Sequence, residues 1–371
     1  PPVRPGLGQS GQVFGVYVHV PFCSRRCDYC AFATWTDRHE LMVPYLSACR
    51  RSLQRAQIPA ATSVFFGGGT PSLVPAELLI SVLSAIETTT DAEVTVECNP
   101  ETVTPDLLAV YRDGGVNRLS FGVQSMVPGT LASLGRRHDP DTVRRAVAWA
   151  DAAGFAGAWN IDLIYGAAGE TAEDWESTLG AVLDLGPAHV SAYALTVEAG
   201  TPLAADRARY PDDDVQADYY ELADDLLGNA GLRWYEISNW AKPGSECRHN
   251  QLYWEQGDYH AVGCAAHGHS GGVRWWNVRT PERFIGLVEA GESVVAGSEQ
   301  LTSEQRALEG LQLALRTRRG VPMDALPAEL IDDGLIVRRG DRAVLTVRGR
   351  LLANEVAHRL VVAGGAVGAA V

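Results

Sequence analysis

The chain has 371 residues, 46% of them apolar, and a formal net charge of −14. This length accommodates one large domain and a smaller one, and the apolar content argues against disorder. No run of lysine and arginine supplies the clustered cations that bind nucleic-acid phosphates, and no window reaches the ~18 uninterrupted apolar residues of a membrane span. Nucleic acid is therefore not an expected partner, and no integral membrane segment is expected.

The first eleven residues are rich in proline and glycine and lack a basic segment followed by an apolar one. They do not resemble a secretory signal, so a cytoplasmic location is predicted.

From residue 13 to about 195, predicted strands alternate with predicted helices. The strands are expected at residues 13–20, 63–66, 93–97, 116–121, 158–163 and 189–193. The helices are expected at residues 40–56, 75–88, 105–113, 140–153 and 171–185. Several helices open with a Thr or Asp cap, as at Thr104-Pro105 and Thr171. Because parallel strands need helical crossovers, the six repeats predict an α/β fold with a parallel sheet.

The second half of the chain shows weaker patterns. Residues 200–295 are rich in Trp, Gly and Asp and look less regular. A helix at 302–316, a hairpin of residues 335–337 and 343–346, and a helix at 349–361 predict a small winged-helix-like α+β domain. The tail, residues 363–371, is expected to fray. The predicted divisions are an N-terminal extension (1–12), a barrel (13–235), a connecting region (236–295) and a C-terminal domain (296–371).

A short polar or glycine-rich motif follows each of the first five predicted strands. These motifs are Pro21-Phe-Cys-Ser, Gly67-Gly-Gly-Thr-Pro-Ser72, Cys98-Asn-Pro-Glu101, Gly122-Val-Gln-Ser125 and Asp162-Leu-Ile-Tyr-Gly166. Loops at the carboxyl ends of barrel strands build the active sites of such folds. We therefore expect these five motifs to meet at one mouth.

The first motif opens the pattern Cys23-x3-Cys27-x2-Cys30, which holds three of the seven cysteines. An odd number of cysteines fits a disulfide framework poorly, and a tight group in a reducing compartment indicates a metal site. Thiolates select zinc, copper(I) or iron–sulfur clusters, and structural zinc normally has four protein ligands. Three thiolates on a [4Fe–4S] cluster leave one iron free to bind the amino and carboxylate groups of S-adenosylmethionine (SAM). Buried free cysteines or a zinc knuckle are the alternatives.

The other strand-end residues have both a functional and a plain structural interpretation. The glycines at 67–69 let backbone approach a ligand, with exposed N–H groups to meet a carboxylate, although a plain tight turn is also possible. Glu97 is either a buried helix-capping acid or an acceptor for the amine or ribose hydroxyls of SAM. Gln124, Arg136 and Asp162 are ordinary polar residues if judged singly, but their shared position after strands favours a binding role.

A further group lies outside the repeats, where His249 precedes Tyr253 and Trp254. From the residues alone, a packed, hydrogen-bonded core histidine is the favoured interpretation. The alternative is an axial ligand to a flat macrocycle, with the aromatic side chains stacking on it. His267, in Gly263-Cys-Ala-Ala-His, is a second candidate for such a ligand.

Together these motifs resemble a known family over almost the whole chain. The resemblance is carried by Gly15-Val-Tyr-Val-His-Val-Pro-Phe-Cys23 through Cys30, Phe65-Phe-Gly-Gly-Gly-Thr-Pro, Val96-Glu-Cys-Asn-Pro, Phe121-Gly-Val-Gln-Ser, Asn160-Ile-Asp-Leu-Ile-Tyr-Gly and Ser191-Ala-Tyr-Ala-Leu. They are similar to the radical SAM family of oxygen-independent coproporphyrinogen III oxidase and its relatives. The resemblance implies a partial (β/α)6 radical-SAM barrel followed by a smaller C-terminal domain.

The resemblance also implies roles for single residues. It implies SAM contacts from Tyr17, Gly69, Thr70, Glu97, Gln124, Arg136, Asp162 and Ala194. It implies that Tyr29, between the second and third cysteines, packs near the adenine.

Three features place the chain nearer to the haem chaperone subgroup (HemW) than to the oxidases. The oxidases have a fourth cysteine where this chain has Phe32, and a longer N-terminal extension than the 22 residues before Cys23. The pattern His249-Asn-x-x-Tyr253-Trp254 is similar to the HemW signature, which makes His249 the expected haem ligand.

The subgroup implies a chaperone that binds haem and a SAM-ligated [4Fe–4S] cluster and delivers haem to client haemoproteins, with an electron donor for the cluster. The alternatives are a coproporphyrinogen III dehydrogenase of porphyrin biosynthesis and an iron–sulfur protein with another substrate. Coproporphyrinogen dehydrogenase activity is not expected, and we assign no catalytic residue.

Overall fold

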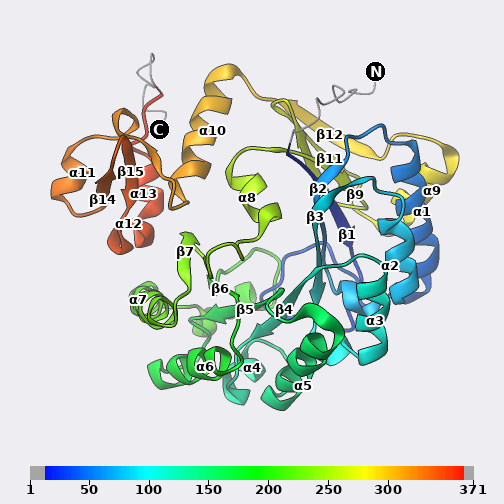
Figure 1. Cartoon of the computed structure of the whole chain (residues 1–371), viewed down its shortest axis with the longest axis horizontal. Helices are drawn as coiled ribbons and strands as arrows, with labels where there is room; N and C mark the ends of the chain where they lie inside the picture. Colours follow the sequence, from blue (N-terminus) through cyan, green and yellow to red (C-terminus); the bar gives the residue numbers. More distant parts are fainter. Residues whose placement is uncertain (1–12, 363–371) are drawn as a thin grey trace.

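The computed structural model describes residues 13–362. The predicted N-terminal extension and the predicted frayed tail lie outside these residues. The described chain forms one large curved sheet with helices on its outer face, and a smaller C-terminal unit lies beside it (Figure 1).

Six parallel strands form the centre of the large sheet. They are β1 (Phe14–Val20), β2 (Ala61–Gly68), β3 (Thr88–Cys98), β4 (Arg118–Gln124), β5 (Trp159–Tyr165) and β6 (His189–Ala194). The helices between them are α1 (Met42–Arg55), α2 (Ala76–Leu83), α3 (Pro105–Asp113), α4 (Pro128–Ser133), α5 (Pro140–Ala150) and α6 (Ala172–Asp184). The predicted caps are confirmed: the Thr104 side chain accepts from Leu107 N–H, and Thr171 forms a capping box with Asp174. The six predicted strand–helix repeats are therefore confirmed, with shifts of a few residues at their ends.

The segment expected to be less regular contains well-formed elements instead. They are α7 (Asp213–Asn229), β7 (Arg233–Glu236), β8 (Asn239–Ala241), α8 (Arg248–Trp254), β9 (Asp258–Val262), β10 (His267–Ser270), β11 (Val273–Asn277), α9 (Pro281–Ala290) and β12 (Val295–Gln300). These strands extend the sheet at both ends into the order β12-β11-β10-β9-β1-β2-β3-β4-β5-β6-β8-β7. Strands of three to six residues pair mostly as antiparallel neighbours here, so no strand–helix rhythm marks them in the sequence. α7 contains several aspartates between its buried residues, so its apolar face is difficult to recognise in the sequence.

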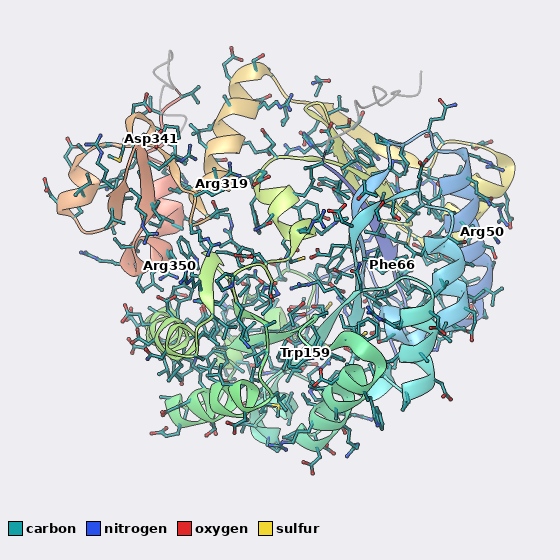
Figure 2. All side chains as sticks on the ribbon, in the orientation of Figure 1. Arg50, Phe66, Trp159, Arg319, Asp341 and Arg350 are labelled. Carbon is teal, nitrogen blue, oxygen red and sulfur yellow. The ribbon has the colours of Figure 1, made fainter. Side chains whose placement is uncertain are left out.

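The C-terminal unit has a three-stranded antiparallel sheet and its own apolar core. Its elements are α10 (Ser303–Leu315), β13 (Val321–Pro322), α11 (Glu329–Asp332), β14 (Ile336–Arg339), β15 (Arg342–Leu345), α12 (Val347–Leu351) and α13 (Ala353–Ala357). Its core is separate from the main core around Phe66 and Trp159. Figure 2 labels Arg350, whose guanidinium pairs with Asp224 of α7 (2.6 Å) and lies over the Trp234 ring, joining this unit to the barrel.

Candidate functional site

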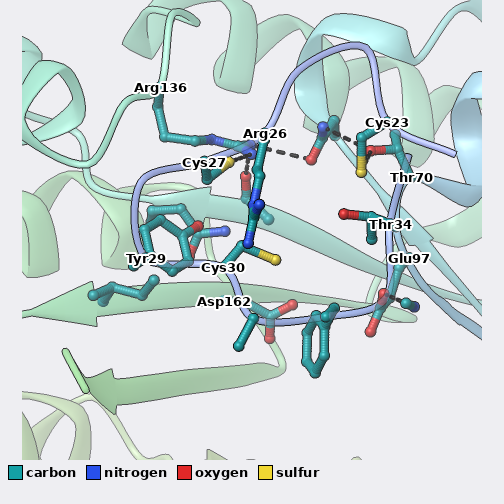
Figure 3. Close-up of a pocket in the computed structure, with 18 of the residues that line it drawn as sticks. Cys23, Arg26, Cys27, Tyr29, Cys30, Thr34, Thr70, Glu97, Arg136 and Asp162 are labelled. Carbon is teal, nitrogen blue, oxygen red and sulfur yellow. Dashed lines mark hydrogen bonds between the residues drawn. The ribbon is translucent and has the colours of Figure 1, made fainter. Parts of the chain in front are cut away.

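A pocket of about 610 Å3 lies at the carboxyl ends of the six parallel strands (Figure 3). Every one of these strands contributes to it, through its last residues or the loop that follows. Its lining includes Cys23, Cys27, Tyr29, Cys30, Gly69, Thr70, Glu97, Gln124, Arg136, Asp162 and Ala194. The predicted meeting of strand-end motifs at one mouth is confirmed.

The three-cysteine loop is anchored at its base. The Cys23 N–H donates to the Trp35 carbonyl (3.1 Å), and the Trp35 N–H donates to the Pro21 carbonyl (2.7 Å). On the β1 side of the loop, the His19 Nε2–H donates to the Ala33 carbonyl (2.9 Å). The loop therefore begins and ends on fixed backbone, and its cysteines are presented to the pocket.

Burial separates the three loop cysteines from the rest. Cys23, Cys27 and Cys30 are partly exposed and line the pocket. The other four cysteines are buried; one of them, Cys98, borders the pocket but is only 2% exposed and belongs to the main core. Burial raises the pKa of the Cys23 thiol to about 11 and also raises that of Cys30, so iron binding would have to displace protons there.

Two polar side chains donate to the cysteine sulfurs. The Thr70 hydroxyl donates to Cys23 Sγ (3.6 Å), and Arg136 Nη1 donates to Cys27 Sγ (3.7 Å). In Figure 3 these two side chains lie on different sides of the cysteine loop. Arg136 Nε is buried without a hydrogen-bond partner among the described residues, and an acceptor on a ligand would satisfy it.

The glycines after β2 have a different role from the expected one. We predicted exposed N–H groups that meet a ligand, but each N–H is already bonded within the protein: Gly68 to Glu97, Gly69 to the Val20 carbonyl and Thr70 to the Phe22 carbonyl. Glycine is required here by close approach. A Cβ on Gly69 would lie 2.7 Å from two backbone oxygens, and one on Gly68, whose φ is +109°, would lie 2.3 Å from the His19 ring.

Two carboxyl groups lie on the floor of the pocket. Burial and, to a lesser extent, the nearby Asp162 raise the pKa of Glu97 to about 8, and the hydrogen bond from the Gly68 N–H (3.0 Å) opposes the rise. Burial also raises the pKa of Asp162, against hydrogen bonds from Ser120 (2.6 Å) and Asn160 (2.9 Å). A cationic ligand would relieve the repulsion between the two carboxylates.

The remaining predicted residues of this group separate into those in the pocket and one outside it. Gln124 lines the pocket with a φ of +67°, a left-handed conformation that non-glycine residues adopt rarely and that clusters at functional sites. Tyr17 is not among the lining residues, so a direct SAM contact from it in this pocket is not supported. Its hydroxyl donates to His19 Nδ1 (3.1 Å), because Nε2 of that ring already donates to a carbonyl.

The described residues contain no group of three or more His, Cys, Asp or Glu side chains gathered tightly enough to hold a single metal ion. The thiolates of structural zinc would meet around one ion at about 2.3 Å each. Thiolates of an iron–sulfur cluster bind different irons and need not gather in this way. The donor set therefore suits a cluster better than a zinc knuckle.

His249 lies elsewhere, on α8, and is 1% exposed. Its Nδ1 is bonded to Ser63 Oγ (2.9 Å), its Nε2 to the Tyr253 hydroxyl (2.8 Å), and its ring stacks on Phe65 at 5.3 Å between centroids. Burial lowers its pKa to about 3, so the ring is neutral. Trp254, expected beside it, instead lies under the Arg316 guanidinium at 4.9 Å.

The second candidate for the haem ligand is exposed, whereas His249 is buried. His267, on β10, is exposed, and its ring stacks on Trp276 at 6.1 Å between centroids.

Sequence analysis missed several pocket residues. Asn99 bonds both Thr70 and Arg136, and its place directly after the β3 strand was the available signal. Arg25 and Arg26 line the mouth beside Phe32, which is 67% exposed. Arginine and single exposed aromatic residues occur on many protein surfaces, so nothing in the sequence distinguished these three from ordinary surface residues.

Within residues 13–362, no helix has the length and apolarity to cross a membrane.

The chain is similar to known proteins both in sequence and in fold. The sequence profile of the Radical SAM superfamily matches residues 17–182. The chain is 43% identical to the heme chaperone HemW of Mycobacterium tuberculosis (strain H37Rv), over 96% of this chain and 97% of that one. It is 39% identical to the heme chaperone HemW of Escherichia coli (strain K12), over 68% of this chain and 69% of that one. The structure of coproporphyrinogen III oxidase (HemN) from Escherichia coli, a radical SAM enzyme, superposes with a TM-score of 0.81 over 93% of this chain and 89% of that one, at 23% identity. That likeness establishes the fold.

Proposed function

Because the chain belongs to the radical SAM superfamily and, within it, to the HemW family of haem chaperones, we propose that it binds haem and a SAM-ligated [4Fe–4S] cluster and delivers the haem to client haemoproteins. The observation that carries the proposal is the 43% identity to a HemW protein along 96% of the chain. A pocket with three thiols and two carboxyl groups supports the SAM and cluster part of it.

Different residues of the pocket bind the cluster and the different parts of SAM. Cys23, Cys27 and Cys30 would hold the cluster, which when bound and reduced would supply the electron for any cleavage of SAM. Glu97 and Asp162 meet the cationic part of SAM. The remaining SAM contacts come from Gly69, Thr70, Gln124, Arg136 and Ala194, and Tyr29 packs near the adenine. Tyr17 acts through His19, which holds the Ala33 carbonyl at the base of the cysteine loop.

The hydrogen bonds of His249 suit a haem ligand. A neutral imidazole has one N–H donor and one lone pair. In the tautomer in which Nδ1–H donates to Ser63 Oγ, the Tyr253 hydroxyl donates to Nε2 and the lone pair available to iron lies on Nε2. Metal-bound histidines have their second nitrogen anchored in this way. Iron at Nε2 would replace the Tyr253 hydroxyl, so ligation requires the Tyr253 side chain to turn away.

The test is a haem titration of the purified protein followed by absorbance. We expect one haem per chain, weaker binding or an altered spectrum for His249→Ala, and tighter binding for Tyr253→Phe because that variant lacks the hydroxyl that competes for Nε2. His267→Ala is the matched control and should bind like wild type. Unchanged binding in His249→Ala with loss in His267→Ala would move the ligand to His267.

A second assay separates the chaperone from the dehydrogenase. The cluster-loaded, reduced protein is incubated with SAM and coproporphyrinogen, and protoporphyrinogen is measured. We expect none. Its formation would refute the chaperone-only function, whatever the haem titration gave.

A further inference from the structure

Asn99 occupies an unusual position among the pocket residues, because it bonds two side chains, Thr70 and Arg136, that donate to sulfurs of the cysteine loop. Its Nδ2 donates to Thr70 Oγ1 (3.2 Å), and its Oδ1 accepts from Arg136 Nη2 (3.1 Å). Thr70 in turn donates to Cys23 and Arg136 donates to Cys27. A continuous chain of hydrogen bonds therefore runs from one cysteine sulfur to another through three residues of three different loops.

The direction of every hydrogen bond in this chain is fixed. Arginine has only donors, so the Asn99 atom that faces Arg136 is the carbonyl oxygen, and the amide nitrogen faces Thr70. With its oxygen accepting from Asn99, the Thr70 hydroxyl is free to direct its hydrogen at Cys23. Rotating the Asn99 amide by half a turn would place N–H groups against the guanidinium and break that link. It would also turn the amide oxygen toward Thr70, whose hydroxyl would then donate to Asn99 instead of Cys23.

The backbone holds Asn99 in place on both sides. The Asn99 N–H donates to Ser72 Oγ (3.1 Å), and its carbonyl accepts from the hydroxyl (2.9 Å) and the N–H (3.0 Å) of Thr102. Arg136 is further held by the Gly122 carbonyl, which accepts from Nη2 (2.7 Å). The relay is therefore set in position before any cofactor binds.

We infer that Asn99 is a positioning residue that aims the Thr70 hydroxyl and the Arg136 guanidinium at the two thiolates and thereby raises the reduction potential of the cluster. Hydrogen bonds to the sulfurs are among the features that set the potential of iron–sulfur clusters, because they stabilise the more negative, reduced state. This inference rests on the proposed cluster ligation. It adds a residue to which neither the sequence motifs nor the comparisons give a role.

The experiment measures the reduced-to-oxidised ratio of the anaerobically reconstituted cluster at one poised potential, by absorbance and electron paramagnetic resonance, without SAM. Asn99→Ala should lower the ratio by about two- to tenfold, the range of one or two hydrogen bonds. Thr70→Val should lower it less, because the Arg136 half remains, and Thr70→Ser should keep it. Because Asn99 acts partly through Thr70, the Asn99→Ala substitution should lower the reduced-to-oxidised ratio less in the Thr70→Val background than in wild type.

Asn277→Ala is the matched control, because the amide of Asn277 is likewise hydrogen-bonded within the fold, to backbone carbonyls, but outside the pocket. Its ratio should equal that of wild type. Equal ratios in wild type and Asn99→Ala, both with full cluster, would overturn the relay while leaving the cluster assignment standing. A wild-type chain that takes up no cluster would overturn the assignment itself, and the relay with it.

Discussion

Replacing Glu97 by glutamine should stabilise the cofactor-free protein and weaken SAM binding at the same time. The carboxyl pKa rises from 4.5 to about 8, through burial first and then the neighbouring Asp162. A rise of this size costs about 3 kcal/mol at pH 7 when the group is sealed from water. Because Glu97 lines an open pocket, solvent screening reduces the cost, and we expect a gain of about 1–2 kcal/mol for Glu97→Gln.

The sign of the pH dependence follows from the raised pKa. The folded state holds the proton more tightly than the unfolded state, so stability falls as the pH rises from about 4.5 to about 8. Glutamine cannot ionise, so the advantage of Glu97→Gln should grow from pH 5 to pH 8 and level off above it. The Gly68 N–H keeps an acceptor, because the amide oxygen replaces the carboxylate oxygen.

Urea denaturation from pH 5 to pH 9 measures the stability, and equilibrium SAM titration of the cluster-loaded protein measures the affinity, which should fall about tenfold or more. Glu170→Gln is the matched control. Burial raises its pKa to about 7, but Glu170 is not a pocket residue, so this variant should gain stability without losing SAM affinity. A Glu97→Gln variant that is no more stable at pH 8 than at pH 5, relative to wild type, would refute the reasoning.

Three other outcomes are expected. Alanine at any of the three loop cysteines should abolish a cluster of about four irons and four sulfides per chain, as measured by iron and sulfide analysis. Alanine at Cys49, Cys98 or Cys264 should leave the cluster in place. The reverse pattern would make the ligand assignment wrong. Asp162→Ala should weaken SAM binding about tenfold in the same titration and keep the cluster, and loss of the cluster would show a structural role instead. Arg350→Ala should destabilise the protein by about 2 kcal/mol in urea denaturation, because it leaves the partly buried carboxylate of Asp224 on α7 without its cationic partner. A change below about 0.5 kcal/mol would contradict that account.

The sequence predicted the barrel well because its signals there are local. The cap at Thr104 and the capping box at Thr171 mark helix starts within four residues, and apolar runs mark strands buried on both faces. Strand-end motifs then meet because parallel strands end on one side of the sheet. Among the additional strands, β7 with β8 and β10 with β11 pair as local hairpins of short strands, whereas β9 depends on a distant partner, such as Gly15 for Tyr259, which no local pattern encodes.

Side-chain partners are harder to predict than positions. The glycines at the end of β2 were placed correctly at the pocket, but the Gly68 N–H bonds to the Glu97 carboxylate and the Gly69 N–H to the Val20 carbonyl, contacts that only the folded chain reveals. The SAM contact of Tyr17 was implied only by the resemblance, and its hydrogen bond to His19 could not be read from the sequence. Asn99 lies in a motif that was expected at the mouth, but it received no role because its importance lies in two hydrogen bonds to residues 29 and 37 positions away.

His249 is compatible with both interpretations that the residues alone presented as alternatives, a packed core histidine and a haem ligand. A histidine packed in a core is normally inert because both ring nitrogens are satisfied, and here Ser63 and Tyr253 satisfy them. The two bonds differ in kind, however. Ser63 belongs to β2, in the middle of the sheet, whereas Tyr253 lies one helical turn away on the same short helix, α8. The packing that makes His249 look like a core residue therefore ties one ring nitrogen to the sheet and leaves the other against a hydroxyl of its own helix, the contact that haem ligation at Nε2 would have to replace.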